Sequence, residues 1–251
     1  MGQTIVLANQ KGGVGKTTTA VNLGAALAEK GKSVLLVDFD AQANLSSSVG
    51  ADRTGKGIYE LLSGEEDGGA VTQETTVGNM RIIPSGPDLT GANIELVNEE
   101  KREFFLRESL QELSAQYDYV FIDSPPSLGL LTLNGLVAAD SVIIPLQTEY
   151  FALEGLTQLL QSIKRVQQQY NRDLDIFGIL FTMYDSRTRL ANDVVQEVLG
   201  YFGKRVFRTI IPRNIRLSEA PSHGIPVTQY DPSCVGARSY VKLAEEVLAR
   251  G

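Results

Sequence analysis

The sequence is short of the residues that build disulfides and histidine- or cysteine-based metal sites. Its 251 residues contain one cysteine, Cys234, and one histidine, His223. One cysteine excludes an intrachain disulfide, which fits a reducing cytoplasm. Together the two residues are too few for a zinc or iron–sulfur site within one chain. We interpret both as structural residues.

Long apolar runs are also missing. No run of 18 apolar residues occurs, and the N-terminal stretch MGQTIVLANQK is too polar for a signal peptide. The hydrophobic fraction of 43% is ample for one buried core. We therefore expect a cytoplasmic protein that forms a single domain over residues 1–251.

Positive charge is scarce overall but unevenly distributed. The formal net charge is −7, which argues against constitutive nucleic-acid binding. Residues 52–118 carry 14 acidic and 6 basic side chains, a net charge of 6 − 14 = −8. Residues 204–218 instead carry five basic side chains and no acidic one. Taken alone, such a basic run is typical of a solvated face.

Short apolar runs alternate with helical stretches along the whole chain. SVLLV, YVFID and SVIIPL are apolar without alternation, which is typical of strands covered on both faces. The repetition predicts an α/β fold with a single doubly wound, mostly parallel sheet and helices on both faces. We expect strands at Thr4–Ala8, Ser33–Phe39, Met80–Pro84, Tyr119–Asp123, Ser141–Leu146, Ile176–Met183 and Val206–Ile211, and helices at Lys16–Glu29, Asn98–Ser114, Leu130–Ala138, Ala152–Tyr170, Arg189–Phe202 and Val235–Ala249.

The stretch QKGGVGKTT, residues 10–18, ends in the tail of the phosphate-binding P-loop pattern G-x-x-x-x-G-K-[ST]. It follows an expected strand and opens an expected helix, which is the context that the pattern requires. The glycines let backbone N–H groups point inward, Lys16 reaches the β- and γ-phosphates of ATP, and the Thr17 hydroxyl ligates Mg²⁺. The expected ATP-binding residues here are Gly12, Gly13, Val14, Gly15, Lys16, Thr17 and Thr18.

Three carboxylates stand at the ends of expected strands. Asp123 ends YVFID, where a Walker-B aspartate belongs, and Asp38 and Asp40 end SVLLVDFD. Ligands of open α/β sheets bind at the carboxyl ends of strands. We predict that Thr17, Asp38 and Asp123 hold Mg²⁺ or its waters. Asp40 is the candidate for aiming a water at the γ-phosphate.

These residues resemble a known group. KGGVGKTT, followed by VDFDAQAN and FIDSPPSLG, is similar to the deviant-Walker P-loop ATPases of the ParA/MinD group. TEYFALEGL, TMYDSRT and IPRNIRLSEAPSHG resemble the chromosome-partitioning ParA/Soj branch, and the resemblance runs from end to end. It implies an ATPase with ATP and Mg²⁺, slow basal turnover, and a homodimer that sandwiches ATP.

The resemblance also assigns residues. The general pattern has a glycine where this chain has Gln10, and the next residue is an additional lysine, Lys11. In the family this lysine reaches the phosphates of ATP in the partner subunit, so Lys11 joins Lys16 and Asp40 as a catalytic candidate. Adenine contacts are implied near the end of the late strand, at Pro212 and Asn214. Met183 is either near the base or a core residue.

The resemblance further implies nonspecific binding of double-stranded DNA by the ATP dimer. Such binding rests on lysine and arginine contacts to phosphates. The family points to Arg187 and Arg216, and Arg189 and the cluster Lys204–Arg208 extend the patch. Joining two patches in a dimer would let ATP control DNA affinity by avidity. The adjacent aromatics Tyr150 and Phe151 are either a base-stacking platform or core residues, and we favour the core.

The leading hypothesis is an ATP-driven DNA-partitioning switch, associated with the nucleoid and triggered to hydrolyse ATP by a ParB-like centromere-binding protein. One alternative is a MinD-like division-site ATPase acting at the membrane. That role needs an amphipathic C-terminal anchor. The sequence ends in LAEEVLARG, whose last turns carry two glutamates, so we expect no membrane partner. A small-molecule ligase and a non-hydrolysing DNA-binding protein remain further alternatives.

Overall fold

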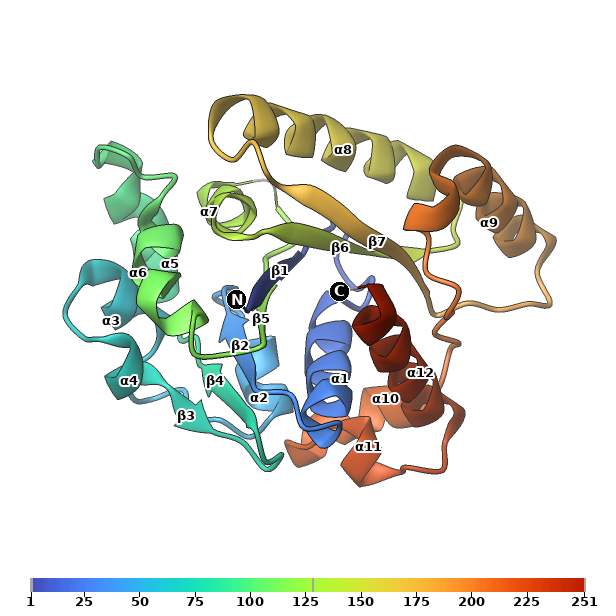
Figure 1. Ribbon diagram of the computed structural model, residues 1–251, viewed down its shortest axis with the longest axis horizontal. Helices are drawn as coiled ribbons and strands as arrows, with labels where there is room; N and C mark the ends of the chain where they lie inside the picture. Colours follow the sequence, from blue (N-terminus) through green and yellow to red (C-terminus); the bar gives the residue numbers. More distant parts are fainter. Residues whose placement is uncertain (1, 128, 251) are drawn as a thin grey trace.

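One seven-stranded sheet runs through the molecule in the order β3-β4-β2-β5-β1-β6-β7 (Figure 1). The computed structural model describes residues 2–127 and 129–250, and at positions 93 and 94 the description is limited to the backbone. All neighbouring strands pair in parallel except the short edge strand β3, which is antiparallel to β4. The strands are β1 Gln3–Leu7, β2 Val34–Asp38, β3 Gln73–Glu74, β4 Met80–Ile83, β5 Tyr119–Asp123, β6 Ser141–Gln147 and β7 Asp175–Thr182.

Helices cover both faces of the sheet, which confirms the predicted fold class. In Figure 1, α7 and α8 lie above the sheet and α1 and α12 lie below it. The helices are α1 Lys16–Glu29, α2 Asn44–Ser48, α3 Ile58–Ser63, α4 Gly68–Val71, α5 Leu89–Glu95, α6 Phe105–Ser114, α7 Leu130–Ala138, α8 Ala152–Gln169, α9 Arg189–Phe202, α10 Arg216–Glu219, α11 Val227–Tyr230 and α12 Val235–Arg250.

The central strands are apolar at every position because both faces are buried. Successive side chains of a strand point to opposite faces. On β1, Ile5 and Leu7 pack with α1 and α12, whereas Val6 packs on the other side with α6, α7 and α8. Residues 34–37 and 119–122 are likewise apolar and buried without interruption. Two apolar cores therefore sandwich the sheet and fix the places where its strands end.

The strand ends bring the predicted site together. β5 pairs with β1 on one side and β2 on the other, and Asp123 is in register with Leu7 and with Asp38. The loop after β1, the end of β2 and the end of β5 thus meet at one edge of the sheet. This edge is where ligands of parallel α/β sheets bind.

The predicted strand Val206–Ile211 is wrong. The segment makes only isolated bridges, from Val206 to Ile179 and from Pro212 to Tyr184. Between them, the backbone N–H groups of Arg208 and Thr209 donate to the Glu246 carboxylate of α12 at 2.9 and 3.0 Å, so they are not available to a neighbouring strand. The apolar pattern of this segment reflects buried Phe207 and Ile211, which pack against the sheet without forming a ladder.

Two more expectations differ from the structure. The helix predicted at Asn98–Ser114 begins only at Phe105, after a short 3-10 turn at Leu96–Asn98. The pair Tyr150 and Phe151 does not belong to the core, because the two residues are 75% and 67% exposed and meet each other edge to face. They sit between β6 and α8, on the same edge as the loop after β1.

Candidate functional site

The loop between β1 and α1 has the shape of a phosphate cradle. Gly13 and Gly15 adopt φ values of 71° and 89°, which side chains with a Cβ rarely tolerate. Gly15 is the residue immediately before α1 and has no capping side chain, so the first N–H groups of the helix stay available for an anion. The backbone therefore supplies donors where a phosphate chain would lie.

A cleft of about 370 Å³ opens over this loop. Its lining draws on four segments at the carboxyl edge of the sheet: the loop itself, the stretch after β2, the stretch after β5 and the residue directly after β7. The residues are Gly12, Gly13, Gly15, Lys16, Thr17, Thr18, Asp40, Gln42, Asn44, Ser48, Ser124, Pro126 and Met183. Most of the predicted phosphate-binding residues are thus in one place. Val14 is buried beneath the loop, where its carbonyl accepts from Thr182 Oγ1 at 2.7 Å.

Lys16 is held in the cleft although it is buried. Only 7% of the residue is exposed, and its Nζ donates to the Asn9 carbonyl at 3.3 Å. Burial lowers the pKa of Lys16, while the charges of Asp123 and Asp40 oppose that shift. A buried ammonium with one hydrogen bond is poorly compensated, so a phosphate oxygen would be a strong partner for it.

Thr17 and Asp123 already touch. The Thr17 hydroxyl donates to Asp123 Oδ2 at 2.5 Å, and Asp123 Oδ1 is buried with no hydrogen-bond partner among the described residues. Burial, with the nearby charge of Asp38, raises the pKa of Asp123 to about 8. A buried carboxylate oxygen without a partner beside a threonine hydroxyl is the donor set that Mg²⁺ prefers. The residues therefore fit the ion that we predicted from the sequence.

Asp38 lies fully buried behind this pair. Its Oδ2 accepts from the backbone N–H and the hydroxyl of Ser46 at 2.8 and 2.6 Å. These bonds favour the charged form, but desolvation is the larger effect and raises the pKa of Asp38 to about 6. Ser46 of α2 thus fixes the orientation of the Asp38 carboxylate, and Asp38 is paired with Asp123 on the neighbouring strand. Its predicted role at the metal site stays a prediction.

Asp40 and Lys11 point in different directions. Asp40 lines the cleft, and its Oδ1 accepts from the Gln42 N–H at 3.0 Å. Lys11 is outside the cleft. Its Nζ forms an ion pair with Glu149, and the two side chains are 46% and 52% exposed. The extra lysine of the loop therefore faces outward from its own subunit.

The predicted adenine contacts lie beside the cleft and are not part of its lining. Pro212 bridges to Tyr184, directly after the end of β7, and the N–H of Arg213 donates to the Tyr184 carbonyl at 3.3 Å. Asn214 turns its Oδ1 to the N–H of Arg216 at 3.1 Å. Met183, in contrast, lines the cleft.

The three predicted DNA contacts are exposed arginines on neighbouring segments. Arg187 and Arg189 lie on the loop and first turn leading into α9, with side chains 87% and 95% exposed. Arg216 begins α10 and is 46% exposed. Each of the three is paired with an acidic residue of its own chain.

Sequence reasoning missed the residues that hold these groups in place. Asn9 anchors the loop by donating to the Pro145 carbonyl at 2.7 Å and accepting from the Lys11 N–H at 3.0 Å. Ser46 orients Asp38, and Glu149 holds Lys11. The only sequence signal for the role of Asn9 is its position as a polar residue directly after a buried-strand pattern. No motif or residue spacing in the sequence indicates that Ser46 would bind Asp38 or that Glu149 would bind Lys11.

Comparison with known proteins agrees with this site. A sequence profile of the AAA domain family matches residues 2–176, which is more than half of the chain. The chain is 59% identical to the chromosome-partitioning ATPase Soj of Treponema pallidum, over 100% of this chain and 98% of the relative. It is 52% identical to the sporulation initiation inhibitor protein Soj of Bacillus subtilis, over 100% of both chains. The chain belongs to the ParA/Soj family of P-loop ATPases.

A solved structure extends the agreement to the ligand. The crystal structure described as cobyrinic acid a,c-diamide synthase from Mycobacterium smegmatis, with bound ADP and magnesium, is 40% identical to this chain. It covers 99% of this chain and 94% of its own, with a TM-score of 0.86. An adenine nucleotide with magnesium, as in that neighbour, is the kind of ligand that the P-loop sequence predicts for this chain.

Proposed function

We propose that this member of the ParA/Soj family is an ATP-dependent DNA-partitioning switch. The chain is a partitioning ATPase that uses ATP and Mg²⁺. With ATP bound, two copies close on each other, the pair binds DNA without sequence preference, and hydrolysis separates the copies. The observation that carries the proposal is Lys11, which stands outside the cleft that its own loop builds.

The residues of the cleft divide the work on ATP. Backbone N–H groups of residues 12–18 and the Lys16 ammonium bind the phosphates, and Thr17 and Asp123 hold the metal, with Asp38 fixed behind them by Ser46. Bound Mg²⁺ would neutralise charge on the β- and γ-phosphates. Asp40 orients the attacking water from the loop that follows β2. Burial raises the pKa of Asp123, and a bound cation would favour its ionised form.

Lys11 provides the link between ATP and dimerisation. It cannot serve its own cleft while it points toward Glu149, but an exposed side chain is free to exchange that partner for phosphate of a second copy. Two triphosphates facing each other repel, and one lysine from each subunit offsets this repulsion. Tyr150 and Phe151 follow Glu149 directly and supply exposed apolar surface on the same edge.

DNA binding rests on Arg187, Arg189 and Arg216. Nonspecific binding needs only cations that reach phosphates, and all three side chains are exposed. A single copy offers few contacts, whereas a dimer doubles them. Because the dimer has twice as many arginine contacts as one copy, it can bind DNA although each chain carries a net charge of −7.

A ParB-like partner completes the cycle by stimulating hydrolysis, and nucleoid association follows from DNA binding. The acidic stretch 52–118 is the candidate surface for a basic segment of that partner. Among the helices within residues 2–127 and 129–250, none has the length and apolarity to cross a bilayer.

The test is DNA binding by fluorescence anisotropy with ATP, ADP and no nucleotide. Wild type should bind a random duplex much more tightly with ATP than with ADP or without nucleotide, and Lys11→Ala should abolish that difference. Lys56→Ala is the matched control, because Lys56 also pairs with a glutamate, Glu66, but lies far from the P-loop in sequence and outside the cleft. Equal DNA affinity of wild type in all three nucleotide states would overturn the proposal.

A further inference from the structure

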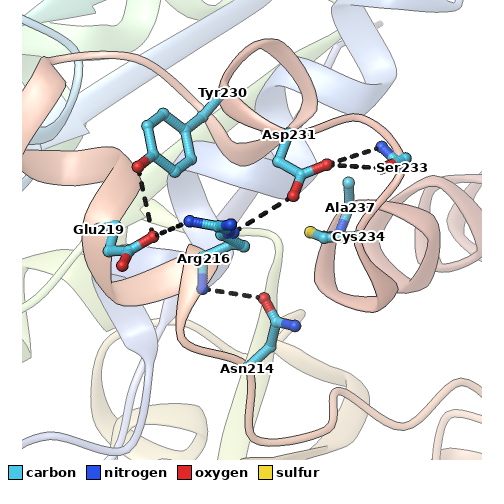
Figure 2. Close-up of polar contacts among 8 residues, drawn as sticks. All are labelled: Asn214, Arg216, Glu219, Tyr230, Asp231, Ser233, Cys234 and Ala237. Carbon is cyan, nitrogen blue, oxygen red and sulfur yellow. Dashed lines mark hydrogen bonds and ion pairs between the residues drawn. The ribbon is translucent and has the colours of Figure 1, made fainter.

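Two carboxylates of the same chain grip the guanidinium of Arg216. Nη1 donates to Glu219 Oε2 at 2.7 Å, and Nε lies 3.3 Å from Asp231 Oδ2 (Figure 2). Glu219 belongs to the same short helix α10, whereas Asp231 follows α11. The arginine therefore sits between two acidic side chains that come from different elements.

Both carboxylates are fixed by other contacts too. Tyr230 donates its hydroxyl to Glu219 Oε2 at 3.3 Å, and Ser233 donates its N–H and hydroxyl to Asp231 Oδ1 at 3.2 and 2.8 Å. Figure 2 shows the acidic groups converging on Arg216 from both sides. The hydrogen bond from Arg216 lowers the pKa of Glu219, and the hydrogen bonds from Ser233 lower the pKa of Asp231. One positive and two negative charges leave the cluster at 1 − 2 = −1.

Arg187 is restrained in a similar way. Asp185 binds its Nε and Nη2 at 2.8 and 2.6 Å, a bidentate pair that lowers the pKa of Asp185 to about 2. Arg189 differs, because its pair with Asp193 is a single contact at 3.7 Å between two highly exposed side chains. Acidic side chains thus hold Arg216 and Arg187 by close hydrogen-bonded contacts, whereas Arg189, the third candidate for DNA contact, is held only weakly.

We propose that Glu219, Asp231 and Asp185 are internal competitors for DNA phosphate, which keep Arg216 and Arg187 from binding DNA until the carboxylates are displaced. This inference rests on the proposed function and adds its control. A phosphate must replace a carboxylate that already occupies the same N–H donors. At Arg216 it must also approach against a residual negative charge, so one copy alone binds weakly.

We call this inhibition of Arg216 and Arg187 by their carboxylate partners the lock. Asn214 connects it to the predicted nucleotide site. Its Oδ1 accepts the backbone N–H of Arg216 at 3.1 Å, and the same residue is the predicted adenine contact. It also lies against α12, since a Cβ added at Gly236 would be 3.2 Å from the Asn214 Oδ1. Turning the Asn214 amide toward a base would free the N–H of Arg216 and loosen the start of α10.

The experiment compares Glu219→Gln/Asp231→Asn, and separately Asp185→Asn, with wild type in anisotropy titrations on a random duplex. We expect DNA affinity in ADP and without nucleotide to rise by about three- to tenfold at low salt for the double variant, because two nearby negative charges are removed. Affinity in ATP should rise less, so the ratio of ATP to ADP affinity falls. Glu245→Gln is the matched control, since Glu245 pairs with Lys30 at 3.0 Å at the other end of α12.

The outcomes separate the lock from the proposed function. Arg216→Ala and Arg187→Ala must weaken DNA binding by the ATP form; if neither does, these arginines do not contact DNA and the inhibition by their carboxylate partners is wrong, while the switch is still judged by whether ATP changes DNA affinity. If they weaken binding but the carboxylate variants bind no better than Glu245→Gln, the lock is wrong and the switch stands. Asp185→Asn keeps the test valid if loss of Asp231 disturbs the Ser233 turn, which urea unfolding of each variant would reveal.

Discussion

Charged groups are handled in opposite ways at the nucleotide cleft and at the arginine surface. At the cleft, Asp38 and Asp123 are buried, and burial raises the pKa of each. At the surface, Asp185 and Glu219 are solvent-accessible, and hydrogen bonds from arginine lower their pKa values. Burying the carboxylates of the empty cleft lowers the stability of the folded protein, whereas the exposed ion pairs contribute little to stability and can exchange partners. This is what a switch needs: a ligand-dependent centre and contacts that can change partners.

The largest expected effect is at the centre of the cleft. Lys16→Ala removes the buried ammonium that meets the phosphates and should lower ATP hydrolysis by about 100-fold or more, since a preorganised charge in a buried site is lost. Phosphate release from ATP measures this. Lys32→Ala changes the same charge beyond the far end of α1 and should leave the rate within about twofold, because Lys32 is half-buried but does not line the cleft. Loss of activity in both variants would mean that general charge and not the cleft is responsible.

Asp123→Asn sharpens the contrast in stability. It removes a carboxylate whose burial is only partly compensated by Thr17 and Lys16, so the nucleotide-free protein should gain about 2 kcal/mol in free energy of unfolding at pH 8 while ATP hydrolysis is lost. Urea unfolding and phosphate release give the two values. Asp118→Asn, at the opposite end of β5, should destabilise instead, because the N–H and hydroxyl of Ser33 bind Asp118 and lower its pKa. If both variants change the free energy of unfolding in the same direction, the contrast between buried and hydrogen-bonded carboxylates is wrong.

Stability of the nucleotide-free protein should depend on pH through Asp38. A carboxyl whose pKa is raised on folding, here to about 6, binds its proton more tightly when folded. Its contribution is present at low pH and is lost as pH rises toward and through 6. Between pH 5 and pH 8, wild type should lose about 1–2 kcal/mol more than Asp38→Asn. Identical pH profiles in urea unfolding would show that Asp38 is already charged at pH 5.

The smallest effect is expected at the surface. Arg189 and Asp193 are 95% and 67% exposed and 3.7 Å apart, so removing the pair with Arg189→Ala/Asp193→Ala should leave the urea midpoint unchanged within error. DNA affinity of the ATP form should still fall, because Arg189 is lost as a phosphate contact. A large drop in the urea midpoint would show that the pair of Arg189 and Asp193 stabilises the fold, against our expectation.

The sequence predicted what depends on local pattern and missed what depends on distant contacts. Continuous apolar runs identified β1, β2, β5 and β6, and their ends identified Asp38 and Asp123, because parallel strands end at one edge. The pattern at 206–211 failed, since the Glu246 carboxylate, 37 or more residues away, takes the N–H groups that a strand would use. Glu149 holds Lys11 across 138 residues, a pairing that only the packed sheet creates.

The most direct measurement of the central claim is the mass of the protein in solution by sedimentation velocity, with the cleft shown to be filled by bound nucleotide. With ATP, wild type should sediment as a dimer and Lys11→Ala as a monomer that still binds ATP. With ADP, both should be monomers. An ATP-filled wild type that stays monomeric, or a Lys11→Ala variant that pairs equally well, would contradict the account.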